Sequence, residues 1–249
     1  MKSIFYITLF SLTLIACKKE KAQIFSLEND VVYPNVKLSF ELTANGLPFV
    51  LDSSFVTNQN YPLEINKFRF YIANVQLINS SDSVLLSDIQ LIDFEDQFSY
   101  KFSITKGTYS TLLLNFGVPD SLNLGDPTTY ENDSPLGIYG SNGMHWSWLT
   151  GYRFLAIDGY AANNVTEPEN IGVSLHTGTE NLYQQKHLEI DSFVVTDQLN
   201  ELVVQIALED IFSINQTDTL DVRTENQSHT FGPTAIKVTN RFLNSWKIK

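Results

Sequence analysis

Alternation of apolar and polar residues recurs along this chain and predicts a fold rich in β-strands. Between Val36 and Thr43 every second residue is apolar, and a period of two is typical of a half-buried strand. The same signal, or a short apolar run bounded by turn residues, predicts further strands at residues 84–93, 100–105, 108–118, 171–176, 187–190 and 202–208.

The segment of residues 66–78 changes phase in its middle. Apolar residues occupy alternate positions from Phe68, and the alternation continues in the opposite phase at Val75. The slip falls at Ala73-Asn74 and predicts a β-bulge or a strand break there, because one extra residue turns every following side chain to the other face.

Residues 117–143 form a long segment without regular periodicity. They hold five of the 12 glycines and three of the eight prolines of the chain. A loop of this length inside a compact domain is usually functional or contains short helical turns. It leads directly into the most aromatic part of the sequence.

The C-terminal segment has the spacing of a short helix. Pro233 stands just before it, at a position where a missing N–H costs nothing. With no repeat and no linker, residues 35–249 are predicted to form a single antiparallel β-sandwich with long loops and this helix. The apolar positions at helical spacing are Ile236, Thr239, Phe242, Leu243 and Trp246, the last expected to anchor the helix in the core.

The N-terminus has the layout of a bacterial lipoprotein signal. Residues 3–16 carry no charge, and these 14 residues are too few to cross roughly 30 Å of hydrocarbon. The motif Leu14-Ile15-Ala16-Cys17 resembles a lipobox. We therefore expect residues 1–16 to be a signal peptide, Cys17 to be lipidated, and residues 17–34 to tether the domain to the outer membrane on its periplasmic or exterior side.

Composition narrows the function further. The 249 residues include 28 acidic and 16 basic side chains, for a net charge of -12, so nucleic acid is not an expected partner. The single cysteine excludes an internal disulfide and a cysteine-based zinc site. No nucleophile elbow, P-loop, GxGxxG or HExxH motif is present, and we predict a binding protein rather than an enzyme.

The candidate chemistry lies in the segment GMHWSWLTGYRF, residues 143–154. In an extended chain, Trp146, Trp148 and Tyr152 would share one face and His145 would point to the other. Histidine, methionine and electron-rich indole suit a soft, redox-active metal such as copper. The alternative is a tryptophan-rich core strand with an exposed histidine.

This segment resembles the signature of the MbnP-like family, the methanobactin-associated copper-binding proteins. The family pattern is G-M-x-W-x-W-x-x-G-Y-x-F followed by E-G, where this chain has Asp158-Gly159. Other blocks resemble the family in the same order, so that the likeness covers most of residues 36–246. These blocks are residues 67–77, residues 106–109 with 116–118, residues 175–178 and residues 235–242.

The resemblance implies a β-sandwich that binds copper in the periplasm. In such proteins a partner di-haem cytochrome c peroxidase oxidises a tryptophan to kynurenine, whose amine and ketone join histidines at the metal. His176 matches the family's histidine before glycine, and His145 is a second candidate ligand at a position often Phe or Tyr. Trp146 and Trp148 match the W-x-W pair, either being a candidate for oxidation. Asp158 replaces the usual Glu with a shorter carboxylate.

Other functions remain open at this stage. The long loop and the aromatic content suit a non-metal binding module, such as an accessory of an outer-membrane uptake system. A glycan hydrolase is disfavoured because no acid pair lies on an identifiable motif. His187 and His229 lie in polar contexts and are expected to be exposed and outside the site.

Overall fold

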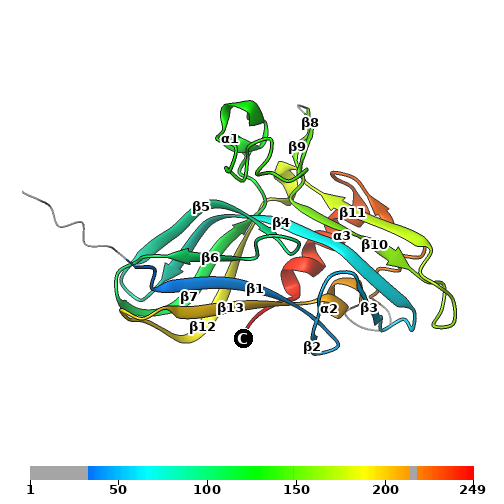
Figure 1. Cartoon of the computed structure of the whole chain (residues 1–249), viewed down its shortest axis with the longest axis horizontal. Helices are drawn as coiled ribbons and strands as arrows, with labels where there is room; N and C mark the ends of the chain where they lie inside the picture. The colour runs from blue at the N-terminus through cyan, green and yellow to red at the C-terminus, as the bar shows by residue number, and fades with distance from the viewer. Residues whose placement is uncertain (1–32, 148, 214–217) are drawn as a thin grey trace, which may run out of the picture. The chain divides into compact units, whose positions relative to one another are not determined.

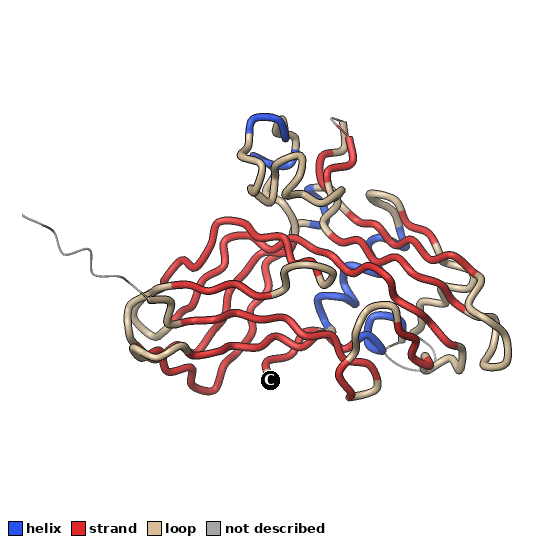
Figure 2. The backbone as a smooth tube through the Cα atoms, viewed as in Figure 1, coloured by secondary structure: helices blue, strands red, loops and turns tan. Residues whose placement is uncertain are grey.

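The computed structural model describes residues 33–147, 149–213 and 218–249, which belong to one compact unit that begins at Tyr33. The predictions for the signal peptide, for Cys17 and for Trp148 lie outside the described residues. Strands dominate the fold, as Figure 2 shows. The predicted all-β class is thereby confirmed.

A five-stranded sheet contains the first and the last strand of the domain. Its order is β15-β13-β1-β2, with β6 also pairing with β1. β1 and β13 are parallel and the other pairs antiparallel, so the sheet is mixed rather than purely antiparallel as predicted. The strands are β1 (Val36–Ala44), β2 (Leu47–Pro48), β6 (Ser99–Phe102), β13 (Asn200–Ala207) and β15 (Trp246–Ile248).

An eight-stranded sheet forms the second layer, in the order β12-β7-β4-β10-β11-β14, with β3 and β5 also pairing with β4. The strands are β3 (Ser53–Val56), β4 (Pro62–Ile78), β5 (Ser83–Asp93), β7 (Gly107–Phe116), β10 (Leu155–Ala161), β11 (Ile171–Thr177), β12 (Gln184–Val195) and β14 (Gln227–Ser228).

The long strand β4 contains the predicted irregularity. Asn74 has a φ of 48°, and the register against β7 shifts between Ala73 and Gln76. An αL residue inside a strand is a local bulge that re-aims the side chains after it. The phase change in the sequence is therefore confirmed as a bulge.

The two large sheets pack together through aromatic side chains. Phe40 of β1 meets Phe70 of β4 with ring centroids 5.3 Å apart, and Phe242 lies 5.0 Å from Phe70. Phe242 belongs to α3 (Pro233–Asn244), which confirms the predicted C-terminal helix. Trp246 is buried as predicted but lies in β15, beyond the end of the helix. A short helix, α2 (Leu208–Phe212), follows β13.

The glycine-rich segment contains α1 (Asp120–Asn123) and a 3-10 turn, η1 (Pro127–Thr129), before the hairpin of β8 (His145–Ser147) and β9 (Gly151–Tyr152). A second 3-10 turn, η2 (Glu180–Leu182), precedes β12. Figure 1 shows α1 and the hairpin projecting at the top of the view, above the middle of the sheets. Within the described residues, no helix is long and apolar enough to cross a membrane.

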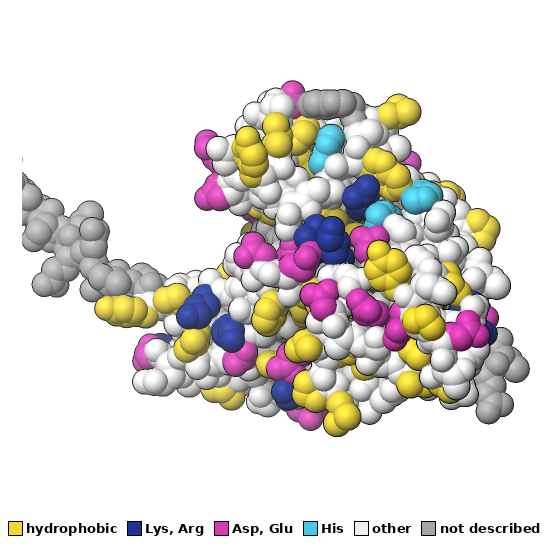
Figure 3. All heavy atoms as spheres, turned by 45° about the vertical axis from the view of Figure 1, so that its right-hand side comes forward, with side chains coloured by type: hydrophobic (Ala, Val, Ile, Leu, Met, Phe, Trp, Pro, Cys, Tyr) yellow, Lys and Arg dark blue, Asp and Glu magenta, His cyan; other side chains and the backbone are white. Residues whose placement is uncertain are grey.

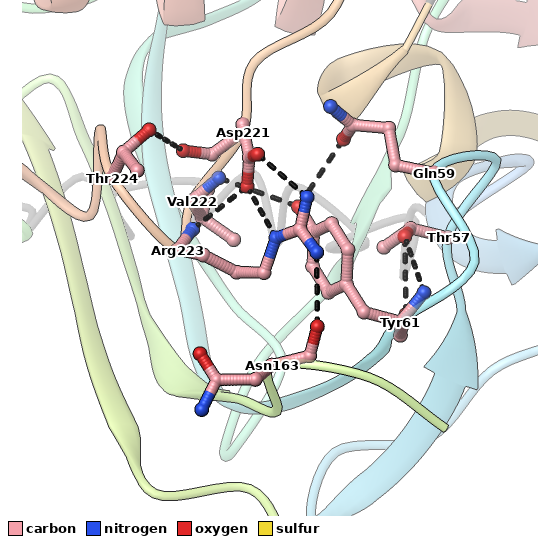
Figure 4. A network of polar contacts seen from close by, with 8 residues as sticks. All are labelled: Thr57, Gln59, Tyr61, Asn163, Asp221, Val222, Arg223 and Thr224. Carbon is pink, nitrogen blue, oxygen red and sulfur yellow. Dashed lines mark hydrogen bonds and ion pairs between the residues drawn. The ribbon is translucent and has the colours of Figure 1, made fainter. Parts of the chain in front are cut away.

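A polar network fastens loops elsewhere on the domain (Figure 4). The Arg223 guanidinium lies 4.4 Å from the centre of the Tyr61 ring and donates to both carboxylate oxygens of Asp221. Its third contact is a hydrogen bond of 2.9 Å to the carbonyl of Asn163. A planar guanidinium that stacks on an aromatic ring and binds a carboxylate with two hydrogen bonds holds both groups in a defined geometry.

Candidate metal centre

Trp146 packs against two imidazole rings that also contact each other. Its ring centroid is 5.5 Å from that of His229 and 6.1 Å from that of His176, and the two imidazoles are 6.3 Å apart. All three pairs meet edge to face, at interplanar angles of 66° to 88°. The side chains come from β8, from β11 and from the segment after β14, so the fold brings three distant parts of the sequence to one place.

The pairing of β11 with β14 explains how His229 reaches His176. The strands are parallel, with Leu175 opposite Ser228. The Ser228 hydroxyl donates to the carbonyl of His176 at 2.9 Å, and the Gly178 N–H donates to the carbonyl of Thr230 at 2.8 Å. These bonds on either side hold residue 229 along the edge of β11.

Trp146 is held from its own hairpin by Arg153. The Arg153 guanidinium carbon lies 4.6 Å from the centroid of the Trp146 ring, and Nη1 donates to the carbonyl of Gly143 at 2.9 Å. A cation over an indole face is attracted by the ring quadrupole. Burial lowers the pKa of Arg153, and the nearby charge of Asp158 acts in the opposite direction.

A second arginine holds the turn that leads into β8. Arg69 Nη1 donates to the carbonyl of Asn142 at 2.8 Å, and its Nε lies 2.8 Å from Asp93. Asn142 Nδ2 donates to the same carboxylate at 2.6 Å. Asn142 and Gly143 both have positive φ angles, 45° and 78°. Arg69 and Arg153 therefore donate to the consecutive carbonyls of Asn142 and Gly143 in this left-handed turn. These bonds fix the position at which β8, the strand of Trp146, begins.

His176 is paired with Asp158. Its Nε2 lies 2.9 Å from Asp158 Oδ1, and the two side chains are 11% and 31% exposed. Burial raises the pKa of Asp158, but the hydrogen bond and charge of His176, the Ser174 hydroxyl and Lys67 together outweigh it and lower that pKa. Asp158 is therefore a carboxylate at neutral pH.

The structure places His145 on a different surface of the hairpin. His145 and Tyr152 are cross-strand partners, and their ring centroids are 5.0 Å apart. Tyr152 thus accompanies His145 rather than Trp146, contrary to the face assignment from the sequence. Burial lowers the pKa of His145, opposed by the charge of Asp126. A metal-ligand role for His145 stays a prediction.

The contact between His229 and Trp146 was not predicted from the sequence. The His229 side chain is exposed, as predicted, but it lies against Trp146. Figure 3 shows histidine side chains exposed around a basic side chain on this part of the surface. No local pattern marks His229, because its position depends on the parallel pairing of β14 with a strand about 50 residues away.

The unmodified side chains give an incomplete ligand set. Among the residues that the structure describes, no three His, Cys, Asp or Glu side chains converge in a way that could hold a metal ion. Two imidazoles and an indole do converge. The donor chemistry at this place therefore fits copper only if the indole is converted into a ligand.

Fold and cluster together define an all-β protein with a centre of one tryptophan and two histidines where a hairpin meets a sheet edge. The family model of MbnP matches residues 33–231, so the chain belongs to the MbnP family. The structure is similar to that of MbnP from Methylosinus trichosporium, with a TM-score of 0.51 and 14% sequence identity, over 71% of this chain and 76% of that one. At this identity the likeness shows the fold alone. No curated protein matches the sequence.

Proposed function

We propose that the protein binds copper at a centre formed by His176, His229 and the kynurenine derived from Trp146, with a di-haem cytochrome c peroxidase as the oxidising partner. The observation that supports this most strongly is the mutual contact of the three rings. Family membership agrees with a methanobactin-associated periplasmic protein. The protein acts in this proposal as a binding protein and as the substrate of its partner, not as an enzyme.

The oxidation supplies the missing ligand. Two peroxide molecules each transfer one oxygen atom to the indole and are reduced to water. The bond between C2 and C3 of the indole breaks, giving N-formylkynurenine. Hydrolysis then releases formate and leaves an aryl amine and a ketone. An amine nitrogen beside two imidazoles is a donor set that suits copper.

Trp146 is the member of the W-x-W pair that lies beside the two imidazoles, whereas Trp148 lies outside the described residues. The side chain of Trp146 is half-buried, and its ring contacts both imidazoles. Trp246 is buried in the aromatic core against Phe242, with centroids 5.1 Å apart. A kynurenine at Trp146 would form next to its co-ligands.

The cellular setting belongs to the same proposal. Lipidation at Cys17 would anchor the domain to the outer membrane and keep it in the compartment where periplasmic cytochromes work. Two acyl signals, unlike one, give stable attachment.

The test is coexpression with a di-haem peroxidase, followed by intact-mass and peptide analysis. We expect the tryptophan-to-kynurenine mass change in the wild type and in Trp148→Phe, and its loss in Trp146→Phe. Copper affinity should fall at least tenfold in His176→Ala and in His229→Ala. The matched control is His187→Ala, because His187 is exposed on β12 and bonded to Gln185.

Two outcomes would overturn the proposal. The first is a wild-type protein that shows neither the mass change nor tight copper binding, which would favour a non-metal binding module. The second is copper binding that survives in both His176→Ala and His229→Ala, which would place the metal elsewhere.

A further inference from the structure

Asp158 and His176 form a defined pair on the sheet beside the candidate centre. Asp158 Oδ1 is 2.9 Å from His176 Nε2, and the Ser174 hydroxyl is 3.3 Å from the same nitrogen. A carboxylate can only accept hydrogen bonds, whereas a neutral imidazole donates from one nitrogen and accepts at the other. The nitrogen facing Asp158 must therefore carry the proton.

We propose that Asp158 is a positioning residue that holds His176 in the tautomer protonated at Nε2, so that Nδ1 is the nitrogen presented to copper. The assignment of Nδ1 as a ligand rests on the proposed function, while the tautomer is a property of the metal-free protein. Carboxylates that accept the second N–H of a metal-bound histidine fix the ring and raise its basicity.

The strand register builds this pair. Asp158 of β10 is opposite Ser174 of β11, and Ala156 is opposite His176. Asp158 therefore lies diagonally across from His176 on the same face, within reach of a long side chain. Because the partner directly opposite His176 is a small alanine, the imidazole has room to turn toward the carboxylate.

A bulge aims the carboxylate. The register between β10 and β4 shifts between Asp158 and Gly159. A Cβ at Gly159 would lie 1.9 Å from the carbonyl oxygen of Glu64, so only glycine lets the strands approach there. On the other side, Asp158 is opposite Lys67 of β4, whose positive charge favours the ionised carboxylate.

His187 provides an internal comparison. It is exposed on β12, and its Nε2 lies 3.0 Å from the side-chain oxygen of Gln185. An amide can donate or accept after a rotation, so this neighbour does not impose one tautomer. The two histidines should therefore differ in tautomer although both have a polar partner at Nε2.

The test uses long-range ¹H–¹⁵N correlation of the metal-free, unoxidised protein at a pH where the imidazoles are neutral. We expect His176 to show protonated Nε2 and unprotonated Nδ1. In Asp158→Ala its two nitrogen shifts should move toward the averaged pattern of His187, and Asp158→Glu should restore the wild-type pattern. Asp88→Ala, which removes an exposed carboxylate from β5, should change nothing.

Asp158→Asn guards against a folding defect, because the amide keeps the size of the carboxylate and removes its charge. It should give a pattern between those of the wild type and Asp158→Ala. A proton on Nδ1 in the wild type, or a His176 pattern unchanged by both neutral variants, would overturn the positioning role.

Measurements of copper binding distinguish a failure of this inference from a failure of the proposed function. In the oxidised protein, Cu(I) should shift Nδ1 of His176 and leave Nε2 protonated, and Asp158→Ala should weaken binding by about 10–100-fold. Absence of copper binding alongside the expected tautomer overturns the proposed function and leaves the positioning role intact. Copper bound through Nε2, or with wild-type affinity in Asp158→Ala, overturns the inference and leaves the proposed function intact.

Discussion

At the residue scale, the candidate centre depends on side chains that hold other side chains. The Arg153 guanidinium lies over the ring of Trp146, and the Asp158 carboxylate lies beside Nε2 of His176. None of these pairs is adjacent in sequence. Arg153 is in turn held by its hydrogen bond to the carbonyl of Gly143.

Arg153 gives a prediction at this scale. Arg153→Met keeps an unbranched side chain over Trp146 but removes the charge and the bond to Gly143. We expect a loss of stability of about 1 kcal/mol, the size of a partly exposed cation–π contact, together with a red shift of Trp146 emission as water reaches the ring. Urea unfolding and fluorescence of a Trp148→Phe, Trp246→Phe background measure both.

The matched variant is Arg153→Lys, which keeps the charge but loses the planar fork. It should fall between the wild type and Arg153→Met in stability. Equal stability of all three proteins would show that the contact over Trp146 contributes nothing to the hairpin.

At the scale of elements, period-two patterning predicted the strands that have one buried face. β1 and the bulged β4 lie where the alternation predicted them. β10 was missed because Asp158 and Gly159 interrupt its apolar run, and β14 and β15 are too short for any pattern. Of the site, His176 and Trp146 were predicted through family resemblance, whereas the contact of His229 required knowledge of strand pairing.

The turn at the end of β7 yields the second prediction. Gly117 has a φ of 97°, and a Cβ there would lie 2.3 Å from the Phe154 ring. Gly117→Ala therefore combines backbone strain with a clash in the core beneath the hairpin, and should cost about 2–3 kcal/mol of stability. Thermal or urea unfolding measures the loss.

Gly172→Ala is the control for this variant. It lies in β11, its φ is not in the left-handed region, and no atom lies within 4 Å of an added Cβ. We expect it to be neutral or to stabilise by up to about 1 kcal/mol, since alanine restricts the unfolded chain. Similar losses in the two variants would argue against a special role for Gly117.

At the scale of the whole domain, buried tyrosines couple stability to alkaline pH. Burial raises the pKa of Tyr61 to about 12, helped by the charge of Asp221 and opposed by a hydrogen bond from Val222 and by Arg223. Burial likewise raises the pKa of Tyr152 to about 12 and the pKa of Tyr71 well above its ordinary value. Tyr71 and Tyr152 contact each other, with ring centroids 5.8 Å apart, whereas Tyr61 lies in the network around Arg223.

The sign of the coupling follows from proton binding. Between pH 10 and pH 12 an unfolded chain releases these phenolic protons while the folded domain keeps them, so stability falls as pH rises through this window. Each fully buried phenol contributes up to about 2 kcal/mol to the loss. Urea midpoints measured from pH 8 to pH 11 should therefore stay level at first and then decline steeply.

Tyr61→Phe isolates one contribution. It removes the phenol that accepts from the Val222 N–H and donates to Gln59, so the variant should be less stable at pH 8. Its further decline above pH 10 should be shallower than that of the wild type, because one titrating group is gone. The two stability curves should thus converge as pH rises. Parallel curves would mean that Tyr61 ionises alike in the folded and unfolded chain, and that the packing over Arg223 does not shield its hydroxyl from water.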